Sequence, residues 1–180
     1  MGKQLEQISS DLQAFIEKQP LFFVATAMPR GKVNLSPKGM DSFRIINPNR
    51  VMWLNVTGSG NETATHLQES SRITVMFCAF EGKPLILRLY GQGKVYHPRD
   101  TAWEEYIHLF PALPGARQLI DIEVEMVQTS CGMAVPFMDF NREREELKNW
   151  AKKQGDEGIN DYWHKKNTMS LDGYPTGIFE

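Results

Sequence analysis

The chain has 180 residues, of which 41% are hydrophobic and 23% are charged, and its formal net charge is −2. A chain of this length forms one domain that can bury about 70% of its unfolded surface without disulfides or bound metal. The near-neutral charge excludes a nucleic-acid-binding surface that depends on a large excess of basic residues. We therefore treat residues 1–180 as a single domain without a nucleic-acid partner.

The longest apolar run, residues 21–28, is far too short to span a bilayer, and the N-terminus lacks the apolar core of a signal peptide. The two cysteines form no CxxC motif, so neither a disulfide framework nor a zinc site is expected. Cys78 lies in an apolar run and is interpreted as a small core residue. Cys131 follows a strand in a loop where a thiol could be accessible, although a structural role is favoured. These features predict a cytoplasmic protein with no membrane association and no metal site.

The spacing of apolar residues predicts the elements of one compact sheet. Apolar residues at three- and four-residue steps predict an N-terminal helix over residues 4–18, which Pro20 ends. Gly91 and Gly93 lie inside the longest predicted strand and indicate a bulge or bend. Alternating or β-branched stretches predict strands at residues 21–28, 32–35, 43–46, 51–56, 72–80, 85–97 and 118–128.

Helices are predicted between and after these strands. Residues 62–68 and 99–109 each form a short helix, and residues 141–153 with 158–166 form a mostly polar helical extension, at about 140–167. Strands at short spacing with helices outside indicate an antiparallel barrel or sheet of the α+β class, mainly β.

Two loops have the composition of phosphate-binding sites. Residues 36–39 (SPKG) bring a hydroxyl, an ammonium and a glycine together at the end of a strand. The glycine loop, residues 57–63 (TGSGNET), precedes a helix and can turn several N–H groups toward an anion. An ordinary turn in the first loop, and a capping box from Ser59 to Glu62 in the second, are the structural alternatives. Two such loops on neighbouring strands favour phosphate binding more than either loop alone.

Other catalytic signatures are missing from the sequence. There is no GxSxG motif, and no GxGxxG motif opens a helix after a strand. The four histidines, at positions 66, 97, 108 and 164, lack the i, i+4 spacing of a helical metal pair. Nucleophilic catalysis and a Rossmann-type dinucleotide site are therefore not expected.

The order of the motifs FFVATA, VNLSPKG, VMWLN, GSGNETATHL, RITVMFCAFEG and LILRLYGQGKVY resembles the FMN-binding split-barrel family related to pyridoxamine 5′-phosphate oxidase. The similarity covers residues 21–96, and the later segment VQTSCGMAVPFMDF resembles an uncharacterised branch rather than the true oxidase. The resemblance implies a six-stranded antiparallel split β-barrel at about residues 21–128, with peripheral helices. It also implies a homodimer with FMN at the subunit interface.

Carried over by position, the resemblance implies a set of cofactor-binding residues but no catalytic residue. Val33 replaces a phosphate-binding arginine of the family, and residues 61–63 lack both cations of its phosphate motif. The phosphate would then depend on Lys38, Ser36, Asn61, Thr63 and backbone N–H groups. The full set is Asn34, Leu35, Ser36, Lys38, Gly39, Trp53, Leu54, Asn55, Ser59, Gly60, Asn61, Thr63 and Arg88.

The resemblance implies an FMN-dependent oxidoreductase that acts on an unknown small molecule. Vitamin B6 oxidation is not expected, because residues 171–180 lack the arginine and histidine with which the true oxidase contacts its substrate. The alternative is a non-catalytic FMN carrier, sensor or haem-handling protein on the same barrel. His66 is the only histidine near the implied site, which disfavours haem. Nucleic-acid binding ranks last, because the barrel lacks a basic groove.

One physical feature also favours a dimer. The segments LFFVATA and ITVMFCAF hold more apolar side chains than the interior of one small barrel accommodates. Some of these side chains are therefore expected to face a second copy of the chain.

Overall fold

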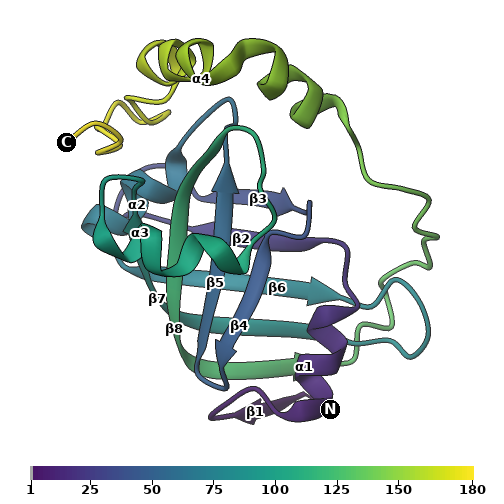
Figure 1. The fold of residues 1–180 in the computed structure, drawn as a ribbon. Helices are drawn as coiled ribbons and strands as arrows, with labels where there is room; N and C mark the ends of the chain where they lie inside the picture. The colour runs from purple at the N-terminus through teal and green to yellow at the C-terminus, as the bar shows by residue number, and fades with distance from the viewer. Residues whose placement is uncertain (1) are drawn as a thin grey trace.

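The computed structural model describes residues 2–180 and contains one antiparallel sheet (Figure 1). The strands form the order β3-β2-β6-β7-β8-β5-β4, and β1 also pairs with β8. The strand bounds are β1 Lys3–Leu5, β2 Phe22–Thr26, β3 Asn34–Lys38, β4 Phe43–Asn47, β5 Arg50–Val56, β6 Arg72–Cys78, β7 Ile86–Tyr96 and β8 Ala116–Ser130.

The sheet has eight strands, so the expected count of six is wrong. The additional N-terminal strand forms because β8 is much longer than its neighbour β5. β5 pairs with β8 only as far as Glu123, and β1 continues along β8 at residues 127–129. The backbone groups at this end of β8 thereby gain partners, which an exposed strand edge would lack.

The predicted N-terminal helix over residues 4–18 is correct only in its second half. Residues Lys3–Leu5 form β1, and the helix α1 spans Ser10–Glu17. The side chain of Ser9 accepts a hydrogen bond from the backbone N–H of Leu12, which caps the helix and sets its start. Leu12 and Ile16 then pack into the barrel core.

The barrel interior is filled by alternate residues of the strands, as a half-buried antiparallel sheet requires. Phe22, Phe43 and Phe77 form an aromatic cluster with ring centroids 5.0 to 5.8 Å apart. This cluster bridges β2, β4 and β6, so side chains span the gap between the two ends of the sheet. Cys78 is buried in this region, as predicted, whereas the exposure of Cys131 contradicts a role in packing.

The predicted bulge lies at Gly91. The register between β7 and β8 shifts between Tyr90 and Gly91. A Cβ at Gly91 would overlap the backbone carbonyl of Glu123, so only glycine allows this close approach of the two strands.

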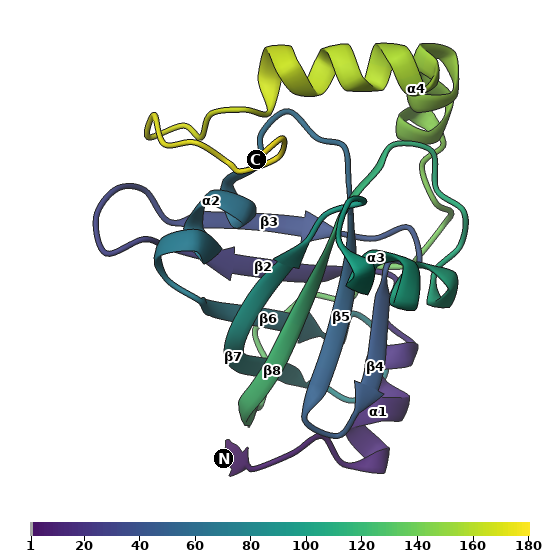
Figure 2. The ribbon, with the colours of Figure 1, turned by 60° about the vertical axis from the view of Figure 1, so that its left-hand side comes forward.

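Four helical segments lie outside the barrel: α2 at Glu62–Glu69, α3 at Thr101–Tyr106, η1 at Ile107–Leu109 and α4 at Glu146–Lys166. The α3–η1 segment covers the outer face of β5 and β8. α4 crosses the end of the barrel where α2 lies (Figures 1 and 2). Gly155 interrupts α4 with φ +64°, close to the predicted break, but the helix begins at Glu146 rather than at residue 141. Among residues 2–180, no helix is long and apolar enough to span a bilayer.

We predict that Asp121→Asn destabilises the fold by about 1–2 kcal/mol. The Asp121 carboxylate receives two hydrogen bonds from Arg50 at 2.8 Å and one from Tyr96 at 3.2 Å, which ties β5, β7 and β8 together. Its side chain is only 13% exposed. Urea denaturation measures the change in the free energy of unfolding.

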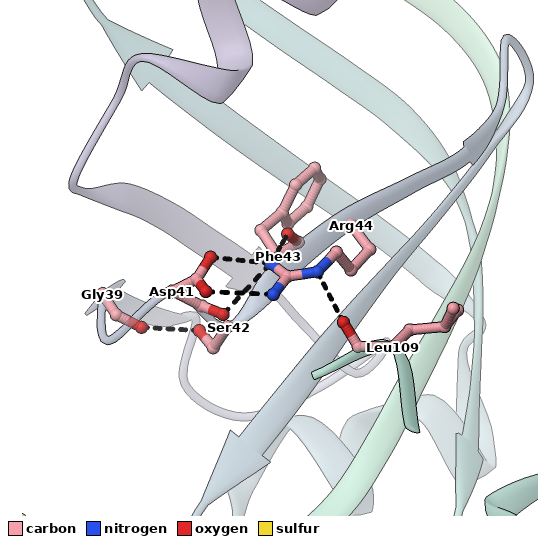
Figure 3. Close-up of polar contacts among 6 residues, drawn as sticks. All are labelled: Gly39, Asp41, Ser42, Phe43, Arg44 and Leu109. Carbon is pink, nitrogen blue, oxygen red and sulfur yellow. Dashed lines mark hydrogen bonds and ion pairs between the residues drawn. The ribbon is translucent and has the colours of Figure 1, made fainter. Parts of the chain in front are cut away.

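Asp41→Asn is the matched control, because Asp41 also forms a two-pronged pair, with Arg44 (Figure 3). The Asp41 side chain is 72% exposed, so its loss should cost less than about 1 kcal/mol. An equal loss of unfolding free energy in the two variants would contradict the idea that burial makes the Asp121 contacts more stabilising.

Candidate functional site

The β2–β3 hairpin divides the predicted site residues between two faces of the sheet. Asn34, Ser36 and Lys38 pair with Thr26, Val24 and Phe22, whose side chains are buried. Directly paired residues share a face, so these three side chains point toward the barrel interior. Leu35 points the other way and is 65% exposed. The structure therefore does not bring Leu35 together with Lys38.

Lys38 lies beside the aromatic core. Its Nζ is 4.8 Å from the centroid of the Trp53 ring, in a cation–π contact. Trp53 is 1% exposed and packs edge-on against Phe22, so it supports Lys38 from inside the barrel. Burial, and secondarily the positive charge of Arg117, lower the pKa of Lys38 to about 8. The ammonium is therefore charged at neutral pH but held without a full shell of water.

Three residues that were predicted to contact the cofactor are either buried or far from the SPKG and glycine loops. Leu54 is fully buried under α3, and Asn55 donates from Nδ2 to Oε1 of Gln118 at 3.0 Å. Arg88 donates to the hydroxyl of Ser130 at 3.0 Å. Because β8 meets the glycine loop at its opposite end, the structure does not bring Arg88 to that loop.

One hydrogen bond joins the glycine loop to β3, the strand that also carries residues 36–38 of the SPKG loop. Nδ2 of Asn34 donates to Oγ1 of Thr63 at 3.2 Å, which links β3 to the start of α2. The Ser42 hydroxyl donates to the carbonyl of Gly39 at 2.6 Å and closes the other turn. β3 and β5, the strands that precede the two predicted loops, are not neighbours in the sheet, so the expectation of neighbouring strands is wrong. The contact with the glycine loop is made by Asn34, at the other end of β3 from Lys38.

The capping-box interpretation of the glycine loop is wrong. Asn61 is the N-cap of α2 and makes no side-chain capping bond, and Ser59 is exposed. The Glu62 carboxylate instead accepts the backbone N–H of Leu171 at 3.0 and 3.1 Å. The loop is therefore held by contacts from a distant part of the chain.

That distant part is the C-terminal strap, residues 167–177, which lies over the glycine loop. Asn167 donates from Nδ2 to the carbonyl of Gly58 at 3.0 Å, and Thr65 donates to the carbonyl of Pro175 at 3.2 Å. Just before the strap, the indole of Trp163 donates to Oγ1 of Thr57 at 2.8 Å. The strap follows the predicted helical extension, and no pattern in its sequence indicated this contact.

Arg117, near the start of β8, is a site residue that the sequence reasoning missed. It is 2% exposed, and its Nη1 donates to the carbonyl of Gly60 at 3.1 Å and to Oδ1 of Asn167 at 2.6 Å. No carboxylate lies within ion-pair distance of it among residues 2–180. Burial lowers its pKa to about 9. The one sequence feature that could have indicated Arg117 is its position directly before the predicted strand at residues 118–128.

Unpaired buried polar atoms collect at this end of the barrel. Within residues 2–180, the buried side-chain atoms without a hydrogen-bond partner are Nδ2 and Oδ1 of Asn61, Nδ1 of His97, Nε of Arg117 and Nε2 of Gln118. Such atoms are rare in folded proteins, because each loses its bonds to water. Amide and guanidinium donors beside two cations fit an anion with several oxygen acceptors, such as a phosphate monoester.

Two hollows lie near this end but do not include Lys38. A cavity of about 560 Å³ has an apolar wall that includes Trp103, Phe110 and Pro114. A second, of about 310 Å³, lies between α2, β7 and the C-terminal strap and includes His97. Neither lining includes a residue of the glycine loop.

Comparison with known proteins identifies the family. Residues 8–131 match the family model described as pyridoxamine 5′-phosphate oxidase. The pyridoxamine 5′-phosphate oxidase family protein ustO of Aspergillus flavus is 37% identical over 188 residues, which cover 94% of this chain and 76% of ustO. The chain belongs to the pyridoxamine 5′-phosphate oxidase family. This result confirms the resemblance inferred from the order of the motifs.

Solved structures support the fold. A variant of HupZ from Group A Streptococcus aligns with a TM-score of 0.54 at 19% identity, over 68% of this chain and 99% of that chain. A Lactobacillus delbrueckii protein provisionally named pyridoxamine 5′-phosphate oxidase also gives 0.54, at 17% identity, over 68% and 94% of the two chains. An antiparallel split barrel with peripheral helices is therefore the fold of this protein, as predicted.

We predict that the Lys38 amine titrates with a midpoint near pH 8, because burial and Arg117 disfavour its charged form. Acylation by acetic anhydride requires the neutral amine, so Lys38 should become reactive as the pH rises through 8. Mass spectrometry of labelled peptides measures the midpoint. Lys32 is the control, since its hydrogen bond to Asp172 raises its pKa. A Lys38 midpoint at or above that of Lys32 would contradict the prediction.

Proposed function

We propose that this protein is an FMN-dependent oxidoreductase that acts on a small molecule and works as a homodimer with FMN at the subunit interface. The observation that carries the proposal is the polar end of the barrel, where Asn34 of β3 holds the glycine loop. Lys38 lies on the same face of β3 as Asn34, and no carboxylate of residues 2–180 forms an ion pair with it. Membership of the pyridoxamine 5′-phosphate oxidase family supports a flavin as the phosphate-bearing ligand.

The residues present fit the phosphate of FMN. Lys38 provides a positive charge, Ser36 a hydroxyl donor, and the glycine loop backbone N–H groups. Asn34 and Thr63 position the loop against β3 through their hydrogen bond. Bound FMN would supply hydride or electron transfer at its ring, and this chain would bind the cofactor, orient it and exclude water.

The remaining surface beside β3 supports a second copy of the chain. β3 is an edge strand, and Val33 and Leu35 beside and on it are 71% and 65% exposed. Phe23 and Met76 share the uncovered face of the sheet with Leu35 and are half-buried. An exposed apolar sheet face of this kind is typical of a subunit interface. Lys38 lies on the opposite side of β3, so a partner on this face would have to extend past the β3 edge to contact a flavin bound at Lys38.

The structure favours flavin over haem for this site. His66, the histidine nearest to the glycine loop in sequence, is 1% exposed. Its Nδ1 shares a hydrogen bond of 3.0 Å with the hydroxyl of Thr26. Coordination of haem iron through Nε2 could keep that bond, but it would have to open the packing of α2 against β2, because the ring is buried.

We predict that the protein binds FMN. Lys38→Met should weaken FMN binding about 10-fold, because one charge-assisted contact to the phosphate is lost. Riboflavin has no phosphate, so its binding should not change. Fluorescence titration of both flavins measures the two affinities. FMN binding should also weaken as the pH rises above 8, because Lys38 then loses its proton. Lys32→Met removes an exposed positive charge and serves as control. A wild-type protein that binds no flavin would refute the proposed function.

Activity is tested with the flavin-loaded protein. FMN-dependent consumption of NADH or NADPH is expected for an oxidoreductase with an external nicotinamide donor. Bound flavin that photoreduces but transfers electrons to no acceptor would instead identify a carrier or sensor.

We predict a dimer at micromolar concentration in sedimentation experiments. Leu35→Glu should shift it to the monomer, because it places a charge on the uncovered sheet face. Leu109→Glu, on the α3 side of the barrel, is the control and should leave the dimer intact. A monomeric wild-type protein would contradict an interfacial cofactor site.

A further inference from the structure

We propose that Arg117 is the second phosphate-binding cation of this site, and that Asn167 of the C-terminal strap occupies its guanidinium until the phosphate replaces it. The inference rests on the proposed function, because the phosphate is that of the bound flavin. It concerns two residues outside the set that the motifs indicated, one from β8 and one from the end of α4.

The first argument is the environment of Arg117. A buried arginine is normally paired with a carboxylate, because removing its charge from water is costly. Here the partners of Nη1 are two neutral oxygens, on Gly60 and Asn167, and Nε has none among residues 2–180. The guanidinium has five N–H donors, so most of its hydrogen-bonding capacity is not used by these contacts. A structural link between two carbonyl groups would not require a full positive charge.

The second argument is what surrounds the guanidinium. The positive charge of Arg117 lowers the pKa of Lys38, so the two cations are close enough to repel each other. Buried Nδ2 of Asn61, which follows Gly60, and Nε2 of Gln118, which follows Arg117 on β8, are donors without acceptors in the described part of the chain. A phosphate monoester carries nearly two negative charges and three acceptor oxygens. It would satisfy these donors and remove the repulsion between the cations.

The third argument is the position of Arg117 relative to the glycine loop. Residues 61–63 carry no cation, although they occupy the place of the family's basic phosphate motif. Arg117 reaches the same loop from β8, through its hydrogen bond to the Gly60 carbonyl. The positive charge is therefore supplied to the loop from a neighbouring strand instead of from the loop itself.

The fourth argument is the nature of the contact with Asn167. Its amide oxygen lies 2.6 Å from Nη1 of Arg117, while its Nδ2 holds the Gly58 carbonyl and its own carbonyl accepts the Thr176 hydroxyl. A phosphate oxygen carries negative charge, so it adds a Coulombic attraction to the guanidinium that the neutral amide oxygen of Asn167 lacks. A phosphate oxygen would therefore displace the Asn167 side chain, and the strap would respond to cofactor binding.

The test compares FMN and riboflavin affinities in two variants. Arg117→Met should lower FMN affinity by about 10- to 100-fold and leave riboflavin affinity unchanged. Asn167→Asp keeps the shape of the side chain but places a carboxylate on Arg117, so it should weaken FMN binding similarly. It also removes the Nδ2 donor to the Gly58 carbonyl, so its readout is the ratio of the two affinities and not the melting temperature. Arg72→Met is the control for net charge, because Arg72 is exposed at the start of β6; it should retain the wild-type ratio of the two affinities.

The possible outcomes separate this inference from the proposed function. If wild type prefers FMN and both site variants keep that preference, Arg117 does not bind the phosphate, although the proposed function stands. If wild type binds neither flavin, the proposed function fails, and inorganic phosphate tests the site alone. Phosphate should then raise the melting temperature of wild type but not of Arg117→Met. An equal effect of phosphate on both proteins would overturn the inference.

Discussion

The arrangement of this end of the barrel depends on a buried positive charge that has no carboxylate partner among residues 2–180. Arg117 is fixed on β8, the strand that pairs with β1, β5 and β7, so the barrel itself determines its position. Its guanidinium then holds the glycine loop through Gly60 and the C-terminal strap through Asn167. One side chain thus joins three parts of the chain that are far apart in sequence. Stability alone does not favour such a residue, because desolvation of an unpaired cation opposes folding.

The remainder of the fold isolates this charge from the apolar core. Inside the barrel, residues such as Val24, Leu87 and Ile122 are fully buried and form a continuous apolar cluster. Polar residues begin where β5, β7 and β8 reach the glycine loop, at Asn55, His97 and Gln118. His97 remains neutral at pH 7, because burial, followed by the charge of Arg99, lowers its pKa to about 4. Arg117 is the buried cation that contacts the loop, through the Gly60 carbonyl.

Much of the fold was predictable because it follows from local patterns. Period-two alternation identified β8, and the glycine pair identified the bulge in β7. β1 was missed because its three exposed residues have no apolar alternation, and it forms only where β5 leaves part of β8 unpaired. The expected helix start failed for the same reason, since apolar spacing continued through Leu5 although the chain there pairs with the sheet. Pairing with β8, and not the local sequence pattern, therefore determined the secondary structure of these residues.

The site was less predictable, because its parts meet only through tertiary contacts. The motifs grouped β3 with the glycine loop, and Asn34 does contact that loop, but strand parity placed Leu35 on the face opposite to Asn34 and Lys38. Nothing local marks Arg117, since its role depends on which loop lies beside the start of β8 and on the lack of an ion-paired carboxylate in the described chain. Its location also explains how residues 61–63 can lack basic side chains without making the loop electrically neutral. A cation on a rigid strand is better positioned than one on a loop, because the hydrogen-bonded ladder fixes its backbone before any ligand arrives.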